Sequence, residues 1–359
     1  MKTHRTLNKI VLFISHISVP AENFYKSWLV LSIVILTLPV FLGCSKSGHP
    51  QDGDFTEDKI ISSVKPAVHK SSESQMLELD ALVFNDDQMQ RLDCYQHMFW
   101  DGMESVPIGS CRGKKILLLC ANLNVEKDFW KQYSSYRKAM TLEARLEDED
   151  PHRPVMAACV HIKAGDEAEI DMGQLSSEVV LRSIKCDFSG KPYAGELITE
   201  AKAYLTNINA TCSLIPQEDN QMKRVINHKG LVQQDLRLFR DSTMIFREIG
   251  NIGTDGIRPS YGFICYPNDA KEETIGTPFT RLVIEGKIMG ETWFWPIDIN
   301  RGPAAIPPEG IGRNSRYVFD ITIRSKGTKD PDTPVTHAML ETVFEVEEWR
   351  EKEEYSVGF

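Results

Sequence analysis

The sequence lacks the short motifs that carry most enzymatic chemistry. It has no GxSxG, P-loop, HExxH or EF-hand loop, and no histidine is followed by another four residues later. Gly250, Gly253 and Gly256 form GxxGxxG, which is not the GxGxxG spacing of a dinucleotide site. We therefore expect neither an enzyme nor a bound metal or cofactor.

The sequence also lacks an excess of positive charge. The 359 residues carry 41 Lys and Arg against 51 Asp and Glu, a net charge of −10. Nucleic-acid binding needs a basic surface that displaces counterions from phosphates, so we expect no nucleic-acid partner. The basic residues near the start, Lys2, Arg5, Lys9 and Lys26, precede an acidic body, which is the layout of a targeting segment.

The sequence contains one long hydrophobic run. Residues 28–43, WLVLSIVILTLPVFLG, contain no charge. The run is shorter than the roughly 20 residues of a spanning helix, and Pro39 would break its last turn. We interpret residues 1–43 as an export signal peptide.

The run ends at Leu42, Gly43 and Cys44, which resemble a bacterial lipobox except that Phe41 replaces the usual Leu. The resemblance implies that Cys44 carries lipid and anchors the chain in the outer membrane. Residues 44–58 are polar and typical of a tether. The alternative is a buried or anchoring helix with an incidental cysteine.

Paired cysteine spacings are missing too. Without Cys44 an odd number remains, no CxxC occurs, and Cys120, Cys159, Cys186 and Cys265 lie in apolar runs. Small core residues are favoured over a zinc site or a disulfide framework. A single bridge, for instance between Cys94 and Cys111, stays open.

The remaining sequence consists of short apolar segments separated by Gly, Pro, Asn and Asp. Segments such as LELDALVF (77–84), KKILLLCANL (114–123) and TRLVIEGKI (280–288) predict strands. Only residues 125–146 have apolar residues at helical spacing, and the acidic run 147–150 that follows is interpreted as solvated charge.

Strands and helices do not alternate, which argues against a doubly wound α/β fold. We predict an all-β protein with two antiparallel β-sandwich domains, residues 59–217 and 234–359, and one helical insertion in the first. The polar residues 218–233 are the predicted linker.

Several segments together resemble the Bacteroidales fimbrillin superfamily, the exported lipoprotein pilins and their accessory subunits. In the first half they are ALVFNDDQMQRLDCY (81–95) and GKKILLLCANL (113–123). In the second half they are residues 280–300, GIGRNSRYVFDITIRSKGTKDPDTPV (310–335), VFEVEEW (343–349) and YSVGF (355–359). The family signature, Arg-Asn-x-x-Tyr, falls on Arg313, Asn314 and Tyr317.

The resemblance implies two transthyretin-like β-sandwich domains and a structural, adhesive subunit of a cell-surface pilus. Its partners would be other pilin subunits, joined by donor-strand exchange, in which a strand of one subunit fills a groove of the next. The donor candidate is 339–359, with apolar anchors at Leu340, Val343, Phe344, Val346 and Trp349. The alternative is that these residues form an edge strand of their own domain.

The resemblance also implies that a surface protease removes a first strand, here residues 59–69. Pro66 predicts an edge position for that strand. No arginine lies between Arg5 and Arg91, so a trypsin-like protease would have to cut at Lys65 or Lys70. An uncut chain would be an anchor or accessory subunit.

A second function stays open. The chain could be a monomeric surface lipoprotein that binds a glycan or host ligand through its loops, with Trp293, Phe294 and Trp295 as candidates for stacking on sugars.

Overall fold

The computed structural model describes residues 59–68, 76–100, 104–217, 222–302, 305–336 and 339–348. The predicted signal peptide, the tether, Cys44, Lys70, Trp349 and residues 355–359 lie outside these ranges. Among the described residues no helix is long and apolar enough to cross a membrane. All of the strands belong to one compact unit, Pro50–Phe359.

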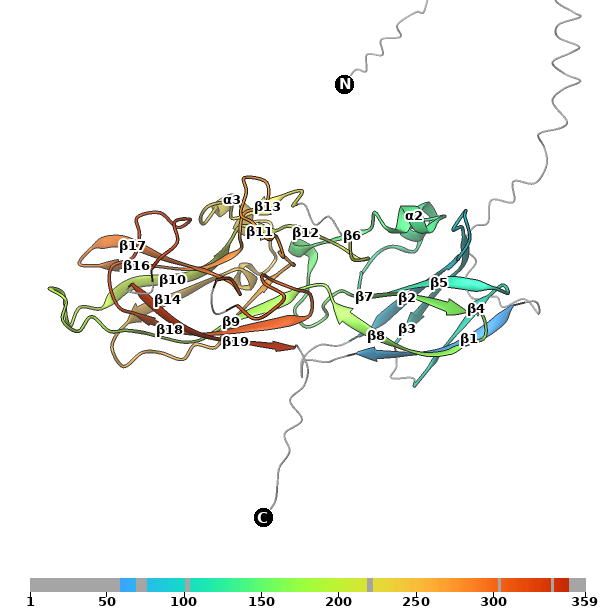
Figure 1. The fold of residues 1–359 in the computed structure, drawn as a ribbon, viewed down its shortest axis with the longest axis horizontal. Coiled ribbons are helices and arrows are strands. Elements are labelled where there is room, and N and C mark those ends of the chain that lie inside the picture. The colour runs from blue at the N-terminus through green and yellow to red at the C-terminus, as the bar shows by residue number, and fades with distance from the viewer. Residues whose placement is uncertain are drawn as a thin grey trace, which may run out of the picture. The chain divides into compact units, whose positions relative to one another are not determined.

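The first part of the chain forms a seven-stranded sheet in the order β3-β2-β5-β7-β8-β1-β4 (Figure 1). Its strands are β1 (Ile60–Val68), β2 (Glu78–Asn85), β3 (Leu92–Phe99), β4 (Val106–Ser110), β5 (Lys114–Ala121), β7 (Met156–Lys163) and β8 (Glu167–Gln174).

This sheet curls so that its two outer strands, β3 and β4, meet. The Gln96 side-chain amide of β3 donates to the Pro107 carbonyl of β4 at 2.9 Å. Inside the curl lies a small hydrophobic core, which includes Val64, Val83, Ile108, Leu117, Ile170 and Met172. β5 is buried on both faces, as its uninterrupted apolar sequence predicts.

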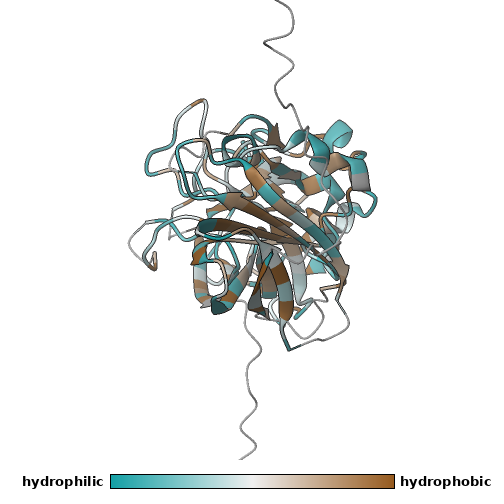
Figure 2. Ribbon diagram, turned by 90° about the vertical axis from the view of Figure 1, so that its right-hand side faces the viewer, coloured by the Kyte–Doolittle hydropathy of each residue, from teal (hydrophilic) through white to brown (hydrophobic). Residues whose placement is uncertain are grey.

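Two four-stranded sheets make up most of the second part. One has the order β14 (Phe246–Ile252), β10 (Ile198–Thr206), β16 (Arg281–Ile288), β17 (Glu291–Asp298). The other has the order β15 (Tyr261–Cys265), β9 (Ser177–Cys186), β18 (Ser315–Ile323), β19 (Leu340–Glu348). Their inner side chains share one large core with the outer face of β2 and β5. Figure 2 shows the hydrophobic residues gathered on the strands and the hydrophilic ones on surrounding loops.

Short elements connect these sheets. β6 (Glu143–Arg145) pairs with β12 (Thr211–Ser213), and β11 (Ile208–Asn209) pairs with β13 (Val225–Ile226). The helical elements are η3 (Lys127–Gln132), α2 (Tyr136–Ala139), η4 (Leu146–Asp148), α3 (Gln233–Leu236) and η5 (Ser242–Met244).

The all-β prediction is confirmed, with two differences in detail. Most neighbouring strands are antiparallel as expected, but β1 pairs parallel with β8 and β9 pairs parallel with β18. The single helix expected over 125–146 is wrong, because the segment forms two short helical turns, η3 and α2, and then the strand β6. Between the two turns the backbone is extended at Ser135, which forms a bridge with Arg91 beside β3.

Strands that precede the predicted linker at 218–233 pair with strands that follow it. β9 and β10 precede it, yet they pair with β15, β18, β14 and β16, which follow it. The strands of the seven-stranded sheet end at Gln174, and β9 begins at Ser177. The division of sheets therefore falls near residue 175, while the division into two tandem domains stays a prediction.

The seven cysteines among the described residues are free thiols. Cys94 is buried in β3, Cys111 is exposed after β4, and no bridge joins them. Burial raises the pKa of the Cys265 thiol to about 12, as expected for a small core residue without nucleophilic function.

Candidate functional site

The first described strand, β1, lies inside the seven-stranded sheet between β8 and β4. Ile60 to Val64 pair antiparallel with β4, and Ser63 to Val68 pair parallel with β8. The expected edge position is wrong because β4 extends the sheet beyond β1. Pro66 is tolerated because β4 pairing ends at Val64, so Pro66 has a neighbour, Ile170 of β8, on one side only.

Few side chains of β1 contribute to the core. Ser62, Val64 and Pro66 are buried, while Ile61 is 46% exposed and Lys65 points to solvent. Full burial of a valine is worth about 1.5–3 kcal/mol, so Val64 adds only modestly to the attachment. β1 is therefore held mainly by backbone pairing, which another strand of suitable sequence could supply.

The strands on either side of β1 are strongly apolar on the side that faces the core. Val106 and Ile108 of β4 and Ile170 and Met172 of β8 are at most 3% exposed. Without β1, the backbone groups of β4 and β8 and these side chains would border an open groove.

The two predicted processing sites differ in position. Lys65 lies within β1, opposite Glu169 of β8, and its ammonium is 3.8 Å from that carboxylate. A cut after Lys65 would leave Pro66 to Val68 paired with β8. Lys70 lies outside the described residues and follows the last residue of β1.

The predicted donor residues begin with an integral edge strand. β19 pairs with β18 over its full length, from Leu340 opposite Ile323 to Glu348 opposite Ser315. Leu340 is buried, and the ring of Phe344 stacks on Phe319 with centroids 5.8 Å apart.

The two faces of β19 differ in exposure. Val346 packs against the core beside Phe344, whereas Val343 points outward and is 58% exposed. Arg182 binds Glu345 at 3.2 Å and adds an ion pair to this outer strand.

The family-motif residues have structural roles. The Arg313 guanidinium donates to the backbone carbonyl of Leu214 at 3.0 Å and also to that of Ser213. Asn314 has φ of 51°, a left-handed conformation that asparagine tolerates better than most residues.

Tyr317, the third motif residue, is 2% exposed. Its hydroxyl accepts from the Gly312 N–H at 2.9 Å and donates to the Gly310 carbonyl at 3.2 Å. The motif thus secures the loop that enters β18.

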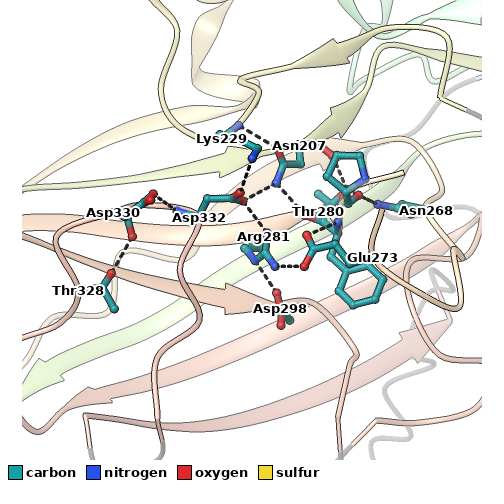
Figure 3. Close-up of polar contacts among 12 residues, drawn as sticks. Asn207, Lys229, Asn268, Glu273, Thr280, Arg281, Asp298, Thr328, Asp330 and Asp332 are labelled. Carbon is teal, nitrogen blue, oxygen red and sulfur yellow. Dashed lines mark hydrogen bonds and ion pairs between the residues drawn. The ribbon is translucent and has the colours of Figure 1, made fainter. Parts of the chain in front are cut away.

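A buried polar cluster around Arg281 was not predicted. The Arg281 side chain is 1% exposed and contacts Glu273 at 2.7 Å, Asp298 at 2.6 Å and Asp332 at 2.6 Å (Figure 3). Asp332 also accepts from the Asn207 side chain at 3.0 Å. The only sequence signal is an arginine at the start of an apolar strand. The cluster joins β16 to the end of β17 and to the two loops that carry Glu273 and Asp332.

The interpretation of the acidic run 147–150 as solvated charge is wrong for Glu149. Its side chain is buried, accepts from the Val155 N–H at 3.1 Å and from the Tyr266 hydroxyl at 3.0 Å. Burial raises the pKa of Glu149 to about 7, although these two hydrogen bonds act in the opposite direction. This carboxyl therefore titrates near neutral pH.

Two of the aromatic side chains at 293–295, Trp293 and Trp295, already contact other residues of the protein. Trp295 is fully buried and donates from its indole to the Ser325 carbonyl at 3.0 Å. The ammonium of Lys329 lies 3.5 Å from the centroid of the Trp293 ring, with Lys326 at 5.1 Å. These cations cover the face that a sugar ring would need.

The chain matches known proteins in structure and not in sequence. No family model matches the sequence, and no curated protein matches it. A putative cell adhesion protein from Bacteroides eggerthii superposes with a TM-score of 0.62 at 14% identity, covering 81% of this chain and 96% of the other. A putative cell adhesion protein from Parabacteroides distasonis gives 0.60 at 15% identity, covering 82% and 97%.

A fimbrilin, FimA, from Porphyromonas gingivalis superposes with a TM-score of 0.57 at 15% identity, covering 81% of this chain and 97% of the other. This chain has the fimbrillin fold. The resemblance seen in the sequence is therefore confirmed at the level of fold, across both the seven-stranded sheet and the two four-stranded sheets.

Proposed function

We propose that this chain is a subunit of a cell-surface pilus, exported as a lipoprotein and assembled by exchange of a strand between neighbours. The observation that supports this most directly is the position of β1, an inserted strand with few buried side chains between two strongly apolar strands. The fold shared with a fimbrilin and with putative cell adhesion proteins supports it further. Catalysis has no part in the proposal.

Removal of β1 would open the groove between β8 and β4. An incoming strand could restore the backbone hydrogen bonds of both and place apolar side chains against Val106, Ile108, Ile170 and Met172. Of the two processing candidates, we favour Lys70, because a cut there would release all of β1, whereas a cut at Lys65 would leave Pro66 to Val68 in place.

The pairing of β19 with β18 narrows the segment that could serve as the donor strand. Residues 340–348 complete their own sheet, and moving them to a neighbour would uncover β18 and break the Phe319–Phe344 stack. We therefore assign the donor role to the sequence after Glu348. In it Tyr355, Val357 and Phe359 alternate with Ser356 and Gly358, the period of two that places apolar side chains on one face of a strand.

The test uses purified protein treated with a lysine-cleaving protease, followed by N-terminal sequencing and electrophoresis without boiling. We expect loss of β1 and SDS-resistant ladders. Lys70→Gln should prevent the loss of β1 and the formation of ladders. Lys65→Gln should still lose β1 and form ladders. Val357→Asp should abolish ladders after cleavage, and Val343→Asp, which alters an outward-facing position of β19, should not.

The second candidate is a monomeric surface lipoprotein. It is favoured by the complete sheets of the described structure, in which both β1 and β19 already have partners. A surface-isolated protein that keeps lipidated Cys44, retains β1 and stays monomeric under the same treatment would support this candidate and remove the pilus assignment.

A further inference from the structure

A buried reactive set of side chains, Asn85, Asp93 and Lys115, lies on β2, β3 and β5. The ammonium nitrogen of Lys115 is 2.5 Å from the side-chain carbonyl oxygen of Asn85 and 2.9 Å from a carboxylate oxygen of Asp93. The Lys115 side chain is 1% exposed and that of Asp93 is 7% exposed. An amine, a carboxamide and a carboxylate therefore meet, with the amine and the carboxylate almost fully buried.

The strand register brings the first two together. Asn85 is directly opposite Lys115 in the antiparallel pair of β2 and β5. Asn85 lies two residues after Val83 and Lys115 two before Leu117, both of which point into the small core. Because side chains alternate along a strand, Lys115 and Asn85 share this face.

A β-bulge brings in the third. Val83 is opposite Cys94 and Phe84 is opposite Leu92, so Asp93 is the extra residue of β3. A bulge redirects a side chain and is often found where a site needs one. The same carboxylate oxygen of Asp93 also accepts from the Cys111 N–H at 2.7 Å, which holds it in place.

We propose that Lys115 and Asn85 join in an intramolecular isopeptide bond, with Asp93 as the group that moves the proton. Asp93 takes a proton from the Lys115 ammonium. The resulting amine nitrogen attacks the side-chain carbonyl carbon of Asn85 and forms a carbon–nitrogen bond. Asp93 returns the proton to the amide nitrogen of Asn85 and takes a second proton from the attacking nitrogen. The bond between carbon and the amide nitrogen of Asn85 then breaks.

The products are a secondary amide between the two side chains and ammonia, which takes the second proton from Asp93 and leaves as ammonium, so that both protons lost by Lys115 leave with it. Atoms and charge balance, Asp93 ends unchanged, and no oxidant, reductant or other reactant is needed. The step resembles other acyl transfers in which a buried amine acts as nucleophile.

The resting state of the set is an ion pair. Burial raises the pKa of Asp93, but hydrogen bonds from Lys115 and Cys111 outweigh this effect, and the pKa lies below its ordinary value. Transfer of the proton within the hydrogen bond gives a neutral amine and a neutral acid. The neutral amine carries the lone pair that attacks, so the reaction starts from this neutral pair.

The link would tie β2 to β5 beside the point where the curled sheet closes. Asn85 and Lys115 are 30 residues apart, and β3 and β4 lie between them in sequence. The bond would prevent these strands from separating fully when the chain is pulled or heated.

The test is tryptic digestion of the full-length protein followed by tandem mass spectrometry. Trypsin does not cut after a lysine whose amine is acylated, so we expect residues 71–91 joined to residues 115–127. The joined peptide should be lighter than the two separate peptides by one ammonia molecule. Recovery of 71–91 and 116–127 only as separate peptides from folded wild-type protein would overturn the proposal and leave a simple ion pair.

Variants assign the roles. Lys115→Arg and Asp93→Asn should each abolish the joined peptide, and circular dichroism should show that they keep their strands. Lys114→Arg, a change at the exposed neighbour on β5, should retain it. Asn85→Asp should yield a joined peptide of the same mass as the wild type, because it loses water instead of ammonia. A link that persists in Asp93→Asn would refute the role of Asp93.

Discussion

The buried carboxyl of Glu149 makes stability depend on pH in a direction opposite to that of most acidic residues. Its pKa is raised from an ordinary value of 4.5 to about 7 in the folded protein. Below pH 4.5 the group is protonated in both states. As the pH rises toward 7 the unfolded chain releases the proton while the folded chain keeps it, so the free energy of unfolding falls.

The size of the effect follows from the two pKa values. At about 1.4 kcal/mol per pKa unit, the loss between pH 4.5 and pH 8 amounts to about 3 kcal/mol. Glu149→Gln is neutral at every pH and removes this dependence. Its side-chain carbonyl can still accept from Val155 or Tyr266, so loss of the other hydrogen bond is a cost that does not vary with pH.

The assay is urea unfolding of wild type and Glu149→Gln at several values between pH 4.5 and pH 8. We expect the variant to gain about 3 kcal/mol relative to wild type across this range, because other titrating groups contribute equally to both proteins. Asp148→Asn, at an exposed neighbour, should follow the wild type. Parallel curves for Glu149→Gln and wild type would show that Glu149 ionises normally and refute the reasoning.

Three further changes are expected to act on stability, measured by urea unfolding at pH 7. Arg281→Met leaves three acidic partners without their cation and should cost about 3–5 kcal/mol; a cost below about 1 kcal/mol would mean that the cluster is solvated. Tyr317→Phe removes two hydrogen bonds inside the loop before β18 and should cost about 1–3 kcal/mol; an unchanged midpoint would contradict that role. Phe344→Ala should cost about 1–2 kcal/mol because the ring is only partly buried, whereas Val343→Ala on the outer side of β19 should change stability by less than about 0.5 kcal/mol.

Local strand structure was predictable from the sequence, whereas strand partners were not. Continuous or alternating apolar residues identify β2, β5 and β16 nearly to their ends. The same pattern does not say which strand lies beside which. β9 and β10 were therefore assigned to the first half, although their partners come from the second.

The candidate sites also depend on strand partners that the sequence does not reveal. The position of β1 followed from a few apolar residues and a family resemblance, but its place inside the sheet depends on β4 and β8, which are distant in sequence. The set formed by Lys115, Asn85 and Asp93 needs a register and a bulge that no local pattern reveals. The expected helix does not form because Ser135 bridges to Arg91, the residue before β3, a tertiary contact that overrides helical spacing.

The parallel pairing of β9 with β18 has a consequence for the order in which the chain folds. Arg182 on β9 bonds Asp320 on β18 across 138 residues of sequence. As the chain emerges in order, the seven-stranded sheet has all of its strands once Gln174 is free, while β9 waits for its first partner, β15, until residue 261 and for β18 until residue 315. Pairings this distant form slowly. A chain interrupted before residue 261 would carry a finished first sheet followed by an unpaired apolar strand, which is the form most exposed to aggregation and proteolysis.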